Sequence, residues 1–355
     1  MEMISYHYNV RYIKPSMYIR TKDTVIKTPS KPLMNIYDPG QLPAKRRKEM
    51  YKIITPVVTV LDQHEKPDHE ANKKVIDFLV NGGVDGILVL GSTGEFTGMD
   101  RQEKSDFFRF YAEYTAGRVE LYAGTGSMNF QDTVALSNEV CDMGYAGPMV
   151  IGPYYYGMDQ EKLFIYYDTL AKSVKGSLYI YNYPARTGYS IAPSTVARLL
   201  EANPNIAGLK DSVSEPNHTN LICLAARGHS FDTYSGFDDQ YLYNITSGGN
   251  GCIGGLSNLV PEIWSALVKA TNDKDFRRSM ELSGLIHELM PLYDLDSNFS
   301  LLFKKVMNHR GLGIADRAIF PYNQMGDETF QRAVKLVDQV LEKFKALNSR
   351  QGQYS

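Results

Sequence analysis

The sequence predicts an α/β protein built on a closed (β/α)8 barrel, the TIM barrel architecture, followed by a C-terminal helical appendage. Three observations support this fold class. From Tyr51 onward, short apolar runs alternate regularly with segments of helical periodicity. The alternation repeats eight times within about 220 residues, as in a closed barrel rather than an open doubly wound sheet. The run that ends at Lys210 is apolar on both faces, which is typical of a parallel sheet covered by helices.

Residues 1–48 precede the alternation and look unlike it. They contain tyrosines, lysines and prolines without a period, and they close on a basic segment at 44–48. The acidic residues Glu2, Asp23 and Asp38 do not fit the acid-poor composition of a transit peptide. We interpret these residues as an irregular N-terminal extension. The sequence leaves open whether it packs on the barrel, contributes to an oligomer contact or is disordered.

The barrel is expected to span residues 49–272. Each unit joins an apolar run to a helix whose apolar residues lie on one stripe. The first such stripe consists of Ala71, Val75, Ile76, Leu79 and Val80. The predicted strands are Ile53–Leu61, Val84–Leu90, Val119–Ala123, Pro148–Ile151, Ser177–Tyr181, Ile206–Lys210, Phe231–Ser235 and Gly251–Leu256.

Residues 273–355 are expected to form the C-terminal helical region, with three further helical segments after the eighth unit. The last helix is predicted to begin near Asp327. Its apolar face consists of Phe330, Val334, Val337, Leu341 and Phe344.

The composition excludes several classes of partner. The chain is 43% hydrophobic and 22% charged, with a net charge of -2 and a pI near 6.4, which gives no electrostatic footprint for nucleic acid or an anionic membrane. No apolar run approaches the roughly 18 residues of a membrane span. Cys141, Cys223 and Cys252 are odd in number and lack metal-site spacing, which fits free thiols in a reducing compartment. We therefore expect a cytoplasmic protein with a small-molecule partner.

The sixth run, Asn205–Asp211, contains a lysine that neither periodicity nor solubility requires. Because active sites of α/β folds lie at the carboxyl ends of parallel strands, Lys210 is placed at the expected mouth of the barrel. A low-dielectric surrounding disfavours the ammonium form, lowers the pKa and frees the amine to attack a carbonyl. The sequence of this stretch predicts Schiff-base chemistry, although a lysine that only snorkels at a strand end would fit it too.

Two earlier strand ends carry further polar groups. After the second run, the segment 91–96 offers two glycines and the hydroxyls of Ser92 and Thr93, which together with backbone amides can hold a carboxylate. A glycine-rich turn that only caps a helix would have the same sequence pattern. After the fourth run come three tyrosines, Tyr154, Tyr155 and Tyr156, which are also compatible with simple packing or an interface.

The fifth and seventh strand ends complete the candidate set. Tyr181 is expected to project into the barrel mouth, where it could move a proton, and Arg186 could clamp a carboxylate with its planar guanidinium. After the seventh run, Asp238 and Asp239 could accept hydrogen bonds from hydroxyl groups, or one of them could cap the next helix.

One motif is rejected. Residues 249–254 match G-x-G-x-x-G, the dinucleotide-binding pattern. The match precedes its strand instead of following one, and no helix opens on it. We therefore predict no dinucleotide site.

Three of these motifs occur together in one known family. G-S-T-G-E after the second strand, Y-N-x-P-x-x-T-G after the fifth and G-L-K-D after the sixth resemble, in order and spacing, the family of dihydrodipicolinate synthase and N-acetylneuraminate lyase. The resemblance covers about residues 50–345. It implies a class I pyruvate-dependent aldolase or lyase that needs neither a metal nor an organic cofactor. It also implies a homotetramer built as a dimer of dimers.

The resemblance assigns roles to individual residues. Lys210 resembles the lysine that forms an imine with pyruvate or another 2-keto acid. Tyr181 resembles the proton carrier that takes a proton from the substrate hydroxyl during cleavage and returns it during condensation. Ser92 and Thr93 resemble the pair that holds the pyruvate carboxylate. Tyr155 matches the second tyrosine of the P-Y-Y motif, which in the synthases enters a neighbouring subunit's proton relay.

Within the family the substrate signals conflict. Arg186 resembles the arginine with which the synthases bind the carboxylate of aspartate semialdehyde. The segment that contains Gly236, Asp238 and Asp239 is instead similar to the aromatic-acid-acid pattern with which sugar-acid lyases bind hydroxyl groups. Gly236 and Ile253 complete the predicted substrate-binding residues. A polyhydroxylated aldehyde needs several acceptors, so we favour a sugar-acid aldolase.

The leading hypothesis is reversible cleavage of a 2-keto-3-deoxy sugar acid, similar to 2-keto-3-deoxygluconate or N-acetylneuraminate, into pyruvate and an aldehyde. The alternative within the class is 4-hydroxy-tetrahydrodipicolinate synthase, which condenses pyruvate with aspartate semialdehyde. A barrel that only binds a keto acid, without catalysis, is a third possibility from a different class.

Overall fold

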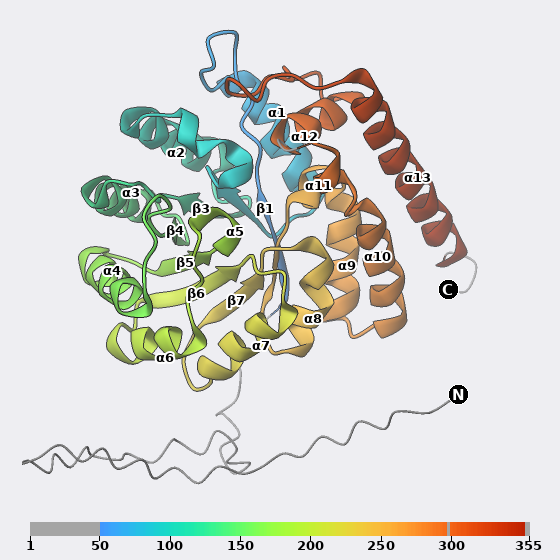
Figure 1. Ribbon diagram of the computed structural model, residues 1–355. Helices are drawn as coiled ribbons and strands as arrows, with labels where there is room; N and C mark the ends of the chain where they lie inside the picture. The colour runs from blue at the N-terminus through green and yellow to red at the C-terminus, as the bar shows by residue number, and fades with distance from the viewer. Residues whose placement is uncertain (1–49, 297–298, 352–355) are drawn as a thin grey trace, which may run out of the picture. The chain divides into compact units, whose positions relative to one another are not determined.

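A computed structural model describes residues 50–296 and 299–351 of the chain. The predicted extension at 1–48 lies outside the described residues. Eight parallel strands close into a barrel in the order β1 to β8, and helices surround it (Figure 1). The predicted TIM barrel is therefore confirmed. The strands are β1 Lys52–Pro56, β2 Gly86–Val89, β3 Glu120–Gly124, β4 Gly147–Ile151, β5 Leu178–Asn182, β6 Ile206–Asp211, β7 Asp232–Ser235 and β8 Gly251–Ile253.

The helices follow the strands in the expected alternation, and more helices follow the eighth unit. Around the barrel lie α1 His69–Asn81, α2 Arg101–Thr115, α3 Phe130–Asp142, α4 Gln160–Ser173, α5 Pro184–Thr187, α6 Pro193–Ala202, α7 Pro216–Ala225, α8 Tyr241–Thr246 and α9 Pro261–Asn272. After them come α10 Phe276–Leu289, α11 Leu292–Leu295, α12 Phe299–His309 and α13 Asp327–Gln351. Short 3-10 helices are η1 Ser92–Gly94, η2 Phe96–Gly98, η3 Asp238–Gln240 and η4 Gly255–Asn258.

The first predicted strand was too long. The apolar run continues to Leu61, but β1 ends at Pro56 and the rest is a buried connection outside the sheet. Side-chain amides replace the sheet partners there: the amide N–H of Val58 donates to Asn258 Oδ1 at 3.1 Å, and that of Val60 donates to Asn72 Oδ1 at 3.1 Å. Burial keeps the run apolar, and these bonds satisfy two backbone amides that have no partner in a strand.

The barrel interior is filled by side chains from alternate strand positions. This layer is unusually rich in tyrosine, and one of its members, Tyr181, lies at the end of β5. Leu209, one residue before Lys210, belongs instead to the outer layer between the barrel and its helices. The pleat of β6 therefore directs Lys210 to the same side as the inner layer. The inner layer consists of Ile54, Leu88, Tyr122, Met149, Ile151, Tyr179, Tyr181, Tyr234 and Ile253.

The C-terminal helices pack together and reach the carboxyl-terminal end of the barrel. α10 contacts α9 and α13, and α12 contacts α13 (Figure 1). Toward the barrel, α12 contacts η1 and α10 contacts η3, the turns that follow β2 and β7. The segments that hold the candidate residues are thus covered by a part of the chain that follows the barrel in sequence.

Candidate active site

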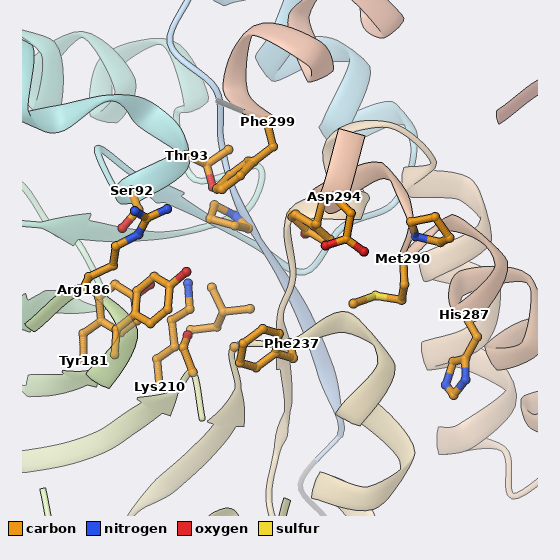
Figure 2. A pocket seen from close by; sticks show the side chains of 18 residues that line it. Ser92, Thr93, Tyr181, Arg186, Lys210, Phe237, His287, Met290, Asp294 and Phe299 are labelled. Carbon is orange, nitrogen blue, oxygen red and sulfur yellow. The ribbon is translucent and has the colours of Figure 1, made fainter. Parts of the chain in front are cut away.

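A cavity of about 640 Å³ opens where the strands end (Figure 2). Its walls come from the strand-end turns of the barrel and from α10, α11 and α12. A concave site at this face is where barrel enzymes assemble their catalytic groups. The cavity is lined by Pro56, Ser92, Thr93, Tyr181, Tyr183, Arg186, Lys210, Ser212, Gly236, Phe237, Ile253, Gly255, His287, Met290, Pro291, Tyr293, Asp294 and Phe299.

Lys210 lies at the base of this cavity with 5% of its surface exposed. β6 pairs with β5 and β7 so that Lys210 is in register with Tyr181 on one side and Tyr234 on the other. Its Nζ atom lies 4.5 Å from the centroid of the Tyr181 ring. Burial lowers the pKa of Lys210 to about 8, and the nearby Asp238 only partly opposes this shift. About a tenth of the lysine is therefore a free, nucleophilic amine at pH 7, far more than for an ordinary lysine.

Tyr181 lies beside the lysine and is 6% exposed. Its ring stacks on that of Tyr183, with centroids 5.7 Å apart. Burial raises the pKa of Tyr181, while the hydroxyls of Ser212 and Ser92 and the charge of Arg186 oppose the rise. The phenol is thus neutral at physiological pH, next to groups that can stabilise it if it gives up a proton. This arrangement suits a side chain that takes and returns a proton during a reaction.

Asp211 anchors the end of β6 from the outer side of the barrel. It is fully buried, and its Oδ1 accepts a hydrogen bond from Asn182 Nδ2 of β5 at 2.8 Å. Its Oδ2 accepts from Thr219 Oγ1 at 2.9 Å and lies 2.9 Å from His218 Nδ1. Because Asn182 and Asp211 directly follow Tyr181 and Lys210, these bonds fix the spacing of the two candidate catalytic side chains.

His218 contacts an acceptor on each side of its ring. Its Nδ1 faces the Asp211 carboxylate, and its Nε2 lies 3.0 Å from the carbonyl oxygen of Ile191. The imidazolium form, in which both ring nitrogens donate, satisfies both contacts. Burial lowers the pKa of His218, but the hydrogen bond and charge of Asp211 outweigh burial and leave the pKa raised.

The turn after β2 is held by the C-terminal helices. Thr93, in η1, is buried, and its carbonyl oxygen accepts a hydrogen bond from Ser300 Oγ of α12 at 2.9 Å. Glu95, which ends η1, has a φ of 55°, in the left-handed region. A non-glycine residue adopts this backbone only where its surroundings hold it there. The surroundings here are a buried ion pair.

Lys304 of α12 forms that ion pair. It is fully buried, its Nζ atom contacts the Glu95 carboxylate, and it donates to the carbonyl oxygen of Thr59 at 3.0 Å. The second oxygen of Glu95 accepts from the amide N–H of Ile319 at 3.0 Å. Burial lowers the pKa of Lys304, and Glu95 opposes this effect. The pair therefore connects the serine-threonine turn to the C-terminal region through two side chains that are almost entirely buried.

Replacing Lys304 with methionine is expected to lower the free energy of unfolding by about 3–5 kcal/mol, because it leaves the Glu95 carboxylate buried without its cation. Urea unfolding followed by circular dichroism measures the loss. The matched control is Lys305→Met, which removes a partly exposed ion pair with Asp316 and should cost about 1 kcal/mol or less. Equal losses in the two variants would contradict a structural role for the buried pair.

Most of the predicted site residues lie together. Lys210 and Tyr181 line the cavity, as do five of the predicted substrate-binding residues. These five are Ser92, Thr93, Arg186, Gly236 and Ile253. Arg186 is exposed at the cavity wall, and its guanidinium carbon lies 5.8 Å from the centre of the Tyr183 ring. It also lines an adjoining cavity of about 490 Å³.

The structure does not bring the two predicted acids into this group. Asp238 is 2% exposed and lies behind the cavity wall, where its carboxylate accepts from the amide N–H groups of Gly255 and Leu256, each at 3.1 Å, and from the Tyr293 hydroxyl at 2.7 Å. Burial raises the pKa of Asp238 to about 6, against the effect of these bonds. Asp239 is exposed and does not line the cavity. β7 ends at Ser235, and the 3-10 helix that follows turns both side chains away.

Tyr155 also lies apart from the cavity. It is 79% exposed, and its ring makes an edge-to-face contact with that of Tyr156, at 5.0 Å between centroids. Within one chain it therefore has no access to the groups around Lys210.

Several lining residues were not predicted. Tyr183 and Ser212 lie two residues after the predicted residues Tyr181 and Lys210, respectively, and also line the cavity. The larger omission is the wall formed by the C-terminal helices. One sequence signal could have indicated this wall: Pro291 interrupts the helical pattern, and polar residues follow it between two apolar helices. This wall contributes His287, Met290, Pro291, Tyr293, Asp294 and Phe299.

Two further properties concern the described residues only. Among them, no group of three or more histidine, cysteine, aspartate or glutamate side chains is arranged to hold a metal ion. No helix in the described ranges combines the length and apolarity that crossing a membrane requires.

Comparison with known proteins agrees with the geometry of the site. Over 292 residues the chain is 30% identical to YagE of Escherichia coli K12, which is provisionally assigned as a 2-dehydro-3-deoxy-D-gluconate aldolase; the match covers 82% of this chain and 96% of YagE. It is 34% identical over 233 residues to the 4-hydroxy-tetrahydrodipicolinate synthase of Kosmotoga olearia, covering 65% of this chain and 79% of the synthase.

The fold comparison gives the same result. The crystal structure of YagE in complex with pyruvate superposes with a TM-score of 0.79 at 29% identity, covering 82% of this chain and 98% of YagE. Residues 49–340 match the Dihydrodipicolinate synthetase family. The resemblance inferred from three short motifs is thereby confirmed over most of the chain, and with it the prediction of a lyase. This chain belongs to the dihydrodipicolinate synthetase family, which comprises pyruvate-dependent aldolases.

Proposed function

We propose that this chain is a class I aldolase that forms an imine with a 2-keto acid and reversibly cleaves a 2-keto-3-deoxy sugar acid to pyruvate and an aldehyde. The observation that carries the proposal is the buried Lys210, with a pKa lowered to about 8, next to the neutral phenol of Tyr181 in a cavity at the barrel mouth. An unprotonated amine and a proton carrier at one site are the two groups that this chemistry requires.

The reaction begins with attack of Lys210 Nζ on the ketone carbon, C2, to give a carbinolamine. Its hydroxyl takes the proton of Tyr181 and leaves as water, so that a protonated imine and a Tyr181 phenolate remain. Protonated, the imine draws electrons from the bond between C3 and C4. Tyr181 accepts the proton of the C4 hydroxyl as that bond breaks, so the aldehyde leaves and the electron pair passes into an enamine. Protonation of the enamine at C3 and hydrolysis of the imine release pyruvate and restore the lysine. We assign the substrate carboxylate to Ser92 and Thr93.

The proposal predicts a specific pH dependence. Only the free amine attacks the ketone, so the rate constant for imine formation with pyruvate should increase with pH and level off above a midpoint of about 8. Borohydride trapping after short incubations at pH 6 to 10 measures this rate. A rate that continues to rise toward about 10.4, the ordinary pKa of lysine, would show that burial does not activate Lys210.

The synthase reaction remains the second candidate, because Arg186 lines the same cavity and could bind the carboxylate of aspartate semialdehyde. Steady-state rates with 2-keto-3-deoxygluconate, N-acetylneuraminate, and pyruvate plus aspartate semialdehyde decide between the two. We expect the highest kcat/KM with a sugar acid. Release of pyruvate from any sugar acid would also exclude a barrel that only binds keto acids.

The remaining proposals concern the whole protein. We propose a cytoplasmic homotetramer in which Tyr155 enters the site of a neighbouring subunit, supported by the exposure of Tyr155 and Tyr156. We further propose that the enzyme needs no metal or organic cofactor. Its proposed parts are the extension 1–48, the barrel 49–272 and the helical region 273–355. Light scattering during size-exclusion chromatography tests the tetramer, and retained activity in EDTA tests the independence from metal.

A further inference from the structure

The charges that line the cavity are separated. Two cations, Lys210 and Arg186, come from the barrel side, where Figure 2 shows Arg186 beside Ser92 and Tyr181. Asp294 projects into the cavity from the opposite side, on α11. Among the described lining residues it is the single carboxylate.

The position of Asp294 is fixed by its neighbours in the chain. Leu292 of α11 is fully buried, and Tyr293 donates its hydroxyl to the Asp238 carboxylate at 2.7 Å. The Tyr293 ring also packs against Phe299 and Phe303, with centroids 5.3 and 5.7 Å away. α11 is therefore attached to the turns after β7 and β8 on one side and to α12 on the other. Asp294, the exposed third residue of α11, thus faces the cavity from a short helix that is held on both sides.

The sequence predicts that Asp238 binds substrate hydroxyls, but in the structure its carboxylate binds protein groups. Its oxygens are occupied by two backbone amides and the Tyr293 hydroxyl, so they are not free to accept from a substrate. By holding Tyr293, Asp238 instead helps to place Asp294.

We propose that Asp294 binds the hydroxyl groups of the aldehyde half of the substrate and selects neutral polyhydroxy aldehydes over anionic ones. This inference rests on the proposed function. An ionised carboxylate offers only acceptors, which match sugar hydroxyls, and it repels a second carboxylate. Arg186 lies across the cavity on the side of the serine-threonine turn, so the positive and the negative side chain face the cavity from opposite ends. An aldehyde held at the Asp294 end therefore meets an acceptor rather than a cation.

The test compares Asp294→Asn with Glu281→Gln, which removes an exposed acid of α10 that pairs with Arg277 outside the cavity. Each variant condenses pyruvate with D-glyceraldehyde, with propanal, which has no hydroxyl, and with succinic semialdehyde, which is anionic. Asp294→Asn should lower kcat/KM for glyceraldehyde about tenfold and leave propanal unchanged, because a charge-assisted hydrogen bond is lost. It should raise kcat/KM for succinic semialdehyde several-fold. Glu281→Gln should change none of the three.

Opposite changes in kcat/KM for the neutral and the anionic aldehyde distinguish a role in substrate recognition from a general loss of activity. A uniform fall for all three aldehydes, or no change in their ratios, overturns the role of Asp294. Borohydride trapping of pyruvate on the wild-type enzyme separates the two proposals. If the adduct forms and the ratios do not change, only the inference about Asp294 fails. If no adduct forms, the proposed function fails and the inference fails with it.

Discussion

Replacing Lys210 with methionine is expected to lower kcat/KM for sugar-acid cleavage by at least about 10⁴-fold, because without the amine no imine forms and the electrons of the broken bond have no acceptor. Methionine has a similar length and suits an apolar site, so the buried position should keep its packing. Pyruvate release in a coupled assay with lactate dehydrogenase measures the loss. Circular dichroism verifies that the variant is folded.

Two controls distinguish the loss of the nucleophilic amine from the loss of its charge and from the effect of replacing any lysine. Lys210→Arg keeps a cation, but its guanidinium stays protonated and cannot attack a ketone, so its loss should equal that of Lys210→Met. Lys162→Met on α4 removes an exposed lysine paired with Asp159, and its activity should equal that of the wild type. Appreciable activity in Lys210→Arg would contradict covalent catalysis at this residue.

Replacing Tyr181 with phenylalanine is expected to lower kcat by about 10²–10⁴-fold, the usual contribution of a positioned acid or base. The ring that packs against Lys210 and Tyr183 is retained, so the loss reports the hydroxyl alone. KM should change little, and pyruvate should still be trapped on Lys210. Steady-state kinetics and borohydride trapping give the two readouts.

The matched control for this variant is Tyr114→Phe on α2, which removes a phenolic hydroxyl bonded to Asp77 at 2.7 Å, outside the cavity. Its kinetic constants should equal those of the wild type. If Tyr181→Phe raised KM and left kcat unchanged, Tyr181 would bind substrate without carrying a proton.

The barrel could be predicted because its rules are local. Alternating apolar runs and helical stripes predict all eight strands, and the position of Lys210 at the end of a run apolar on both faces predicts its place at the barrel mouth. The errors arise where an apolar run continues beyond its strand. Val57 to Leu61 stay apolar because they are buried, and periodicity reports burial, not hydrogen bonding.

The rest depended on contacts between distant parts of the chain. Glu95 and Lys304 are 209 positions apart, and nothing near either residue indicates that they form a buried pair. The sequence likewise shows that Asp238 is acidic but not that two backbone amides and Tyr293 use its oxygens. Such partners are set by tertiary packing, so residue type and spacing alone could not reveal them.

The positions of Arg186 and Asp294 resolve the conflict between the two substrate predictions. From the sequence, Arg186 indicated an anionic aldehyde and the acids after the seventh strand indicated a sugar. In the structure, Arg186 lies on the side of Ser92, and the carboxylate that faces it across the cavity is Asp294. An arginine at one end of the cavity and a carboxylate at the other are compatible with one substrate, a 2-keto-3-deoxy sugar acid, whose carboxylate and hydroxyl groups also lie at opposite ends.

The central claim is that Lys210 forms a covalent imine with pyruvate, and one measurement tests it directly. The protein is incubated with pyruvate and sodium borohydride, digested, and its peptides are identified by tandem mass spectrometry. The account predicts a reduced pyruvyl adduct on the peptide that contains Lys210, formed only when both reagents are present. No adduct, or an adduct on a different lysine, would contradict it.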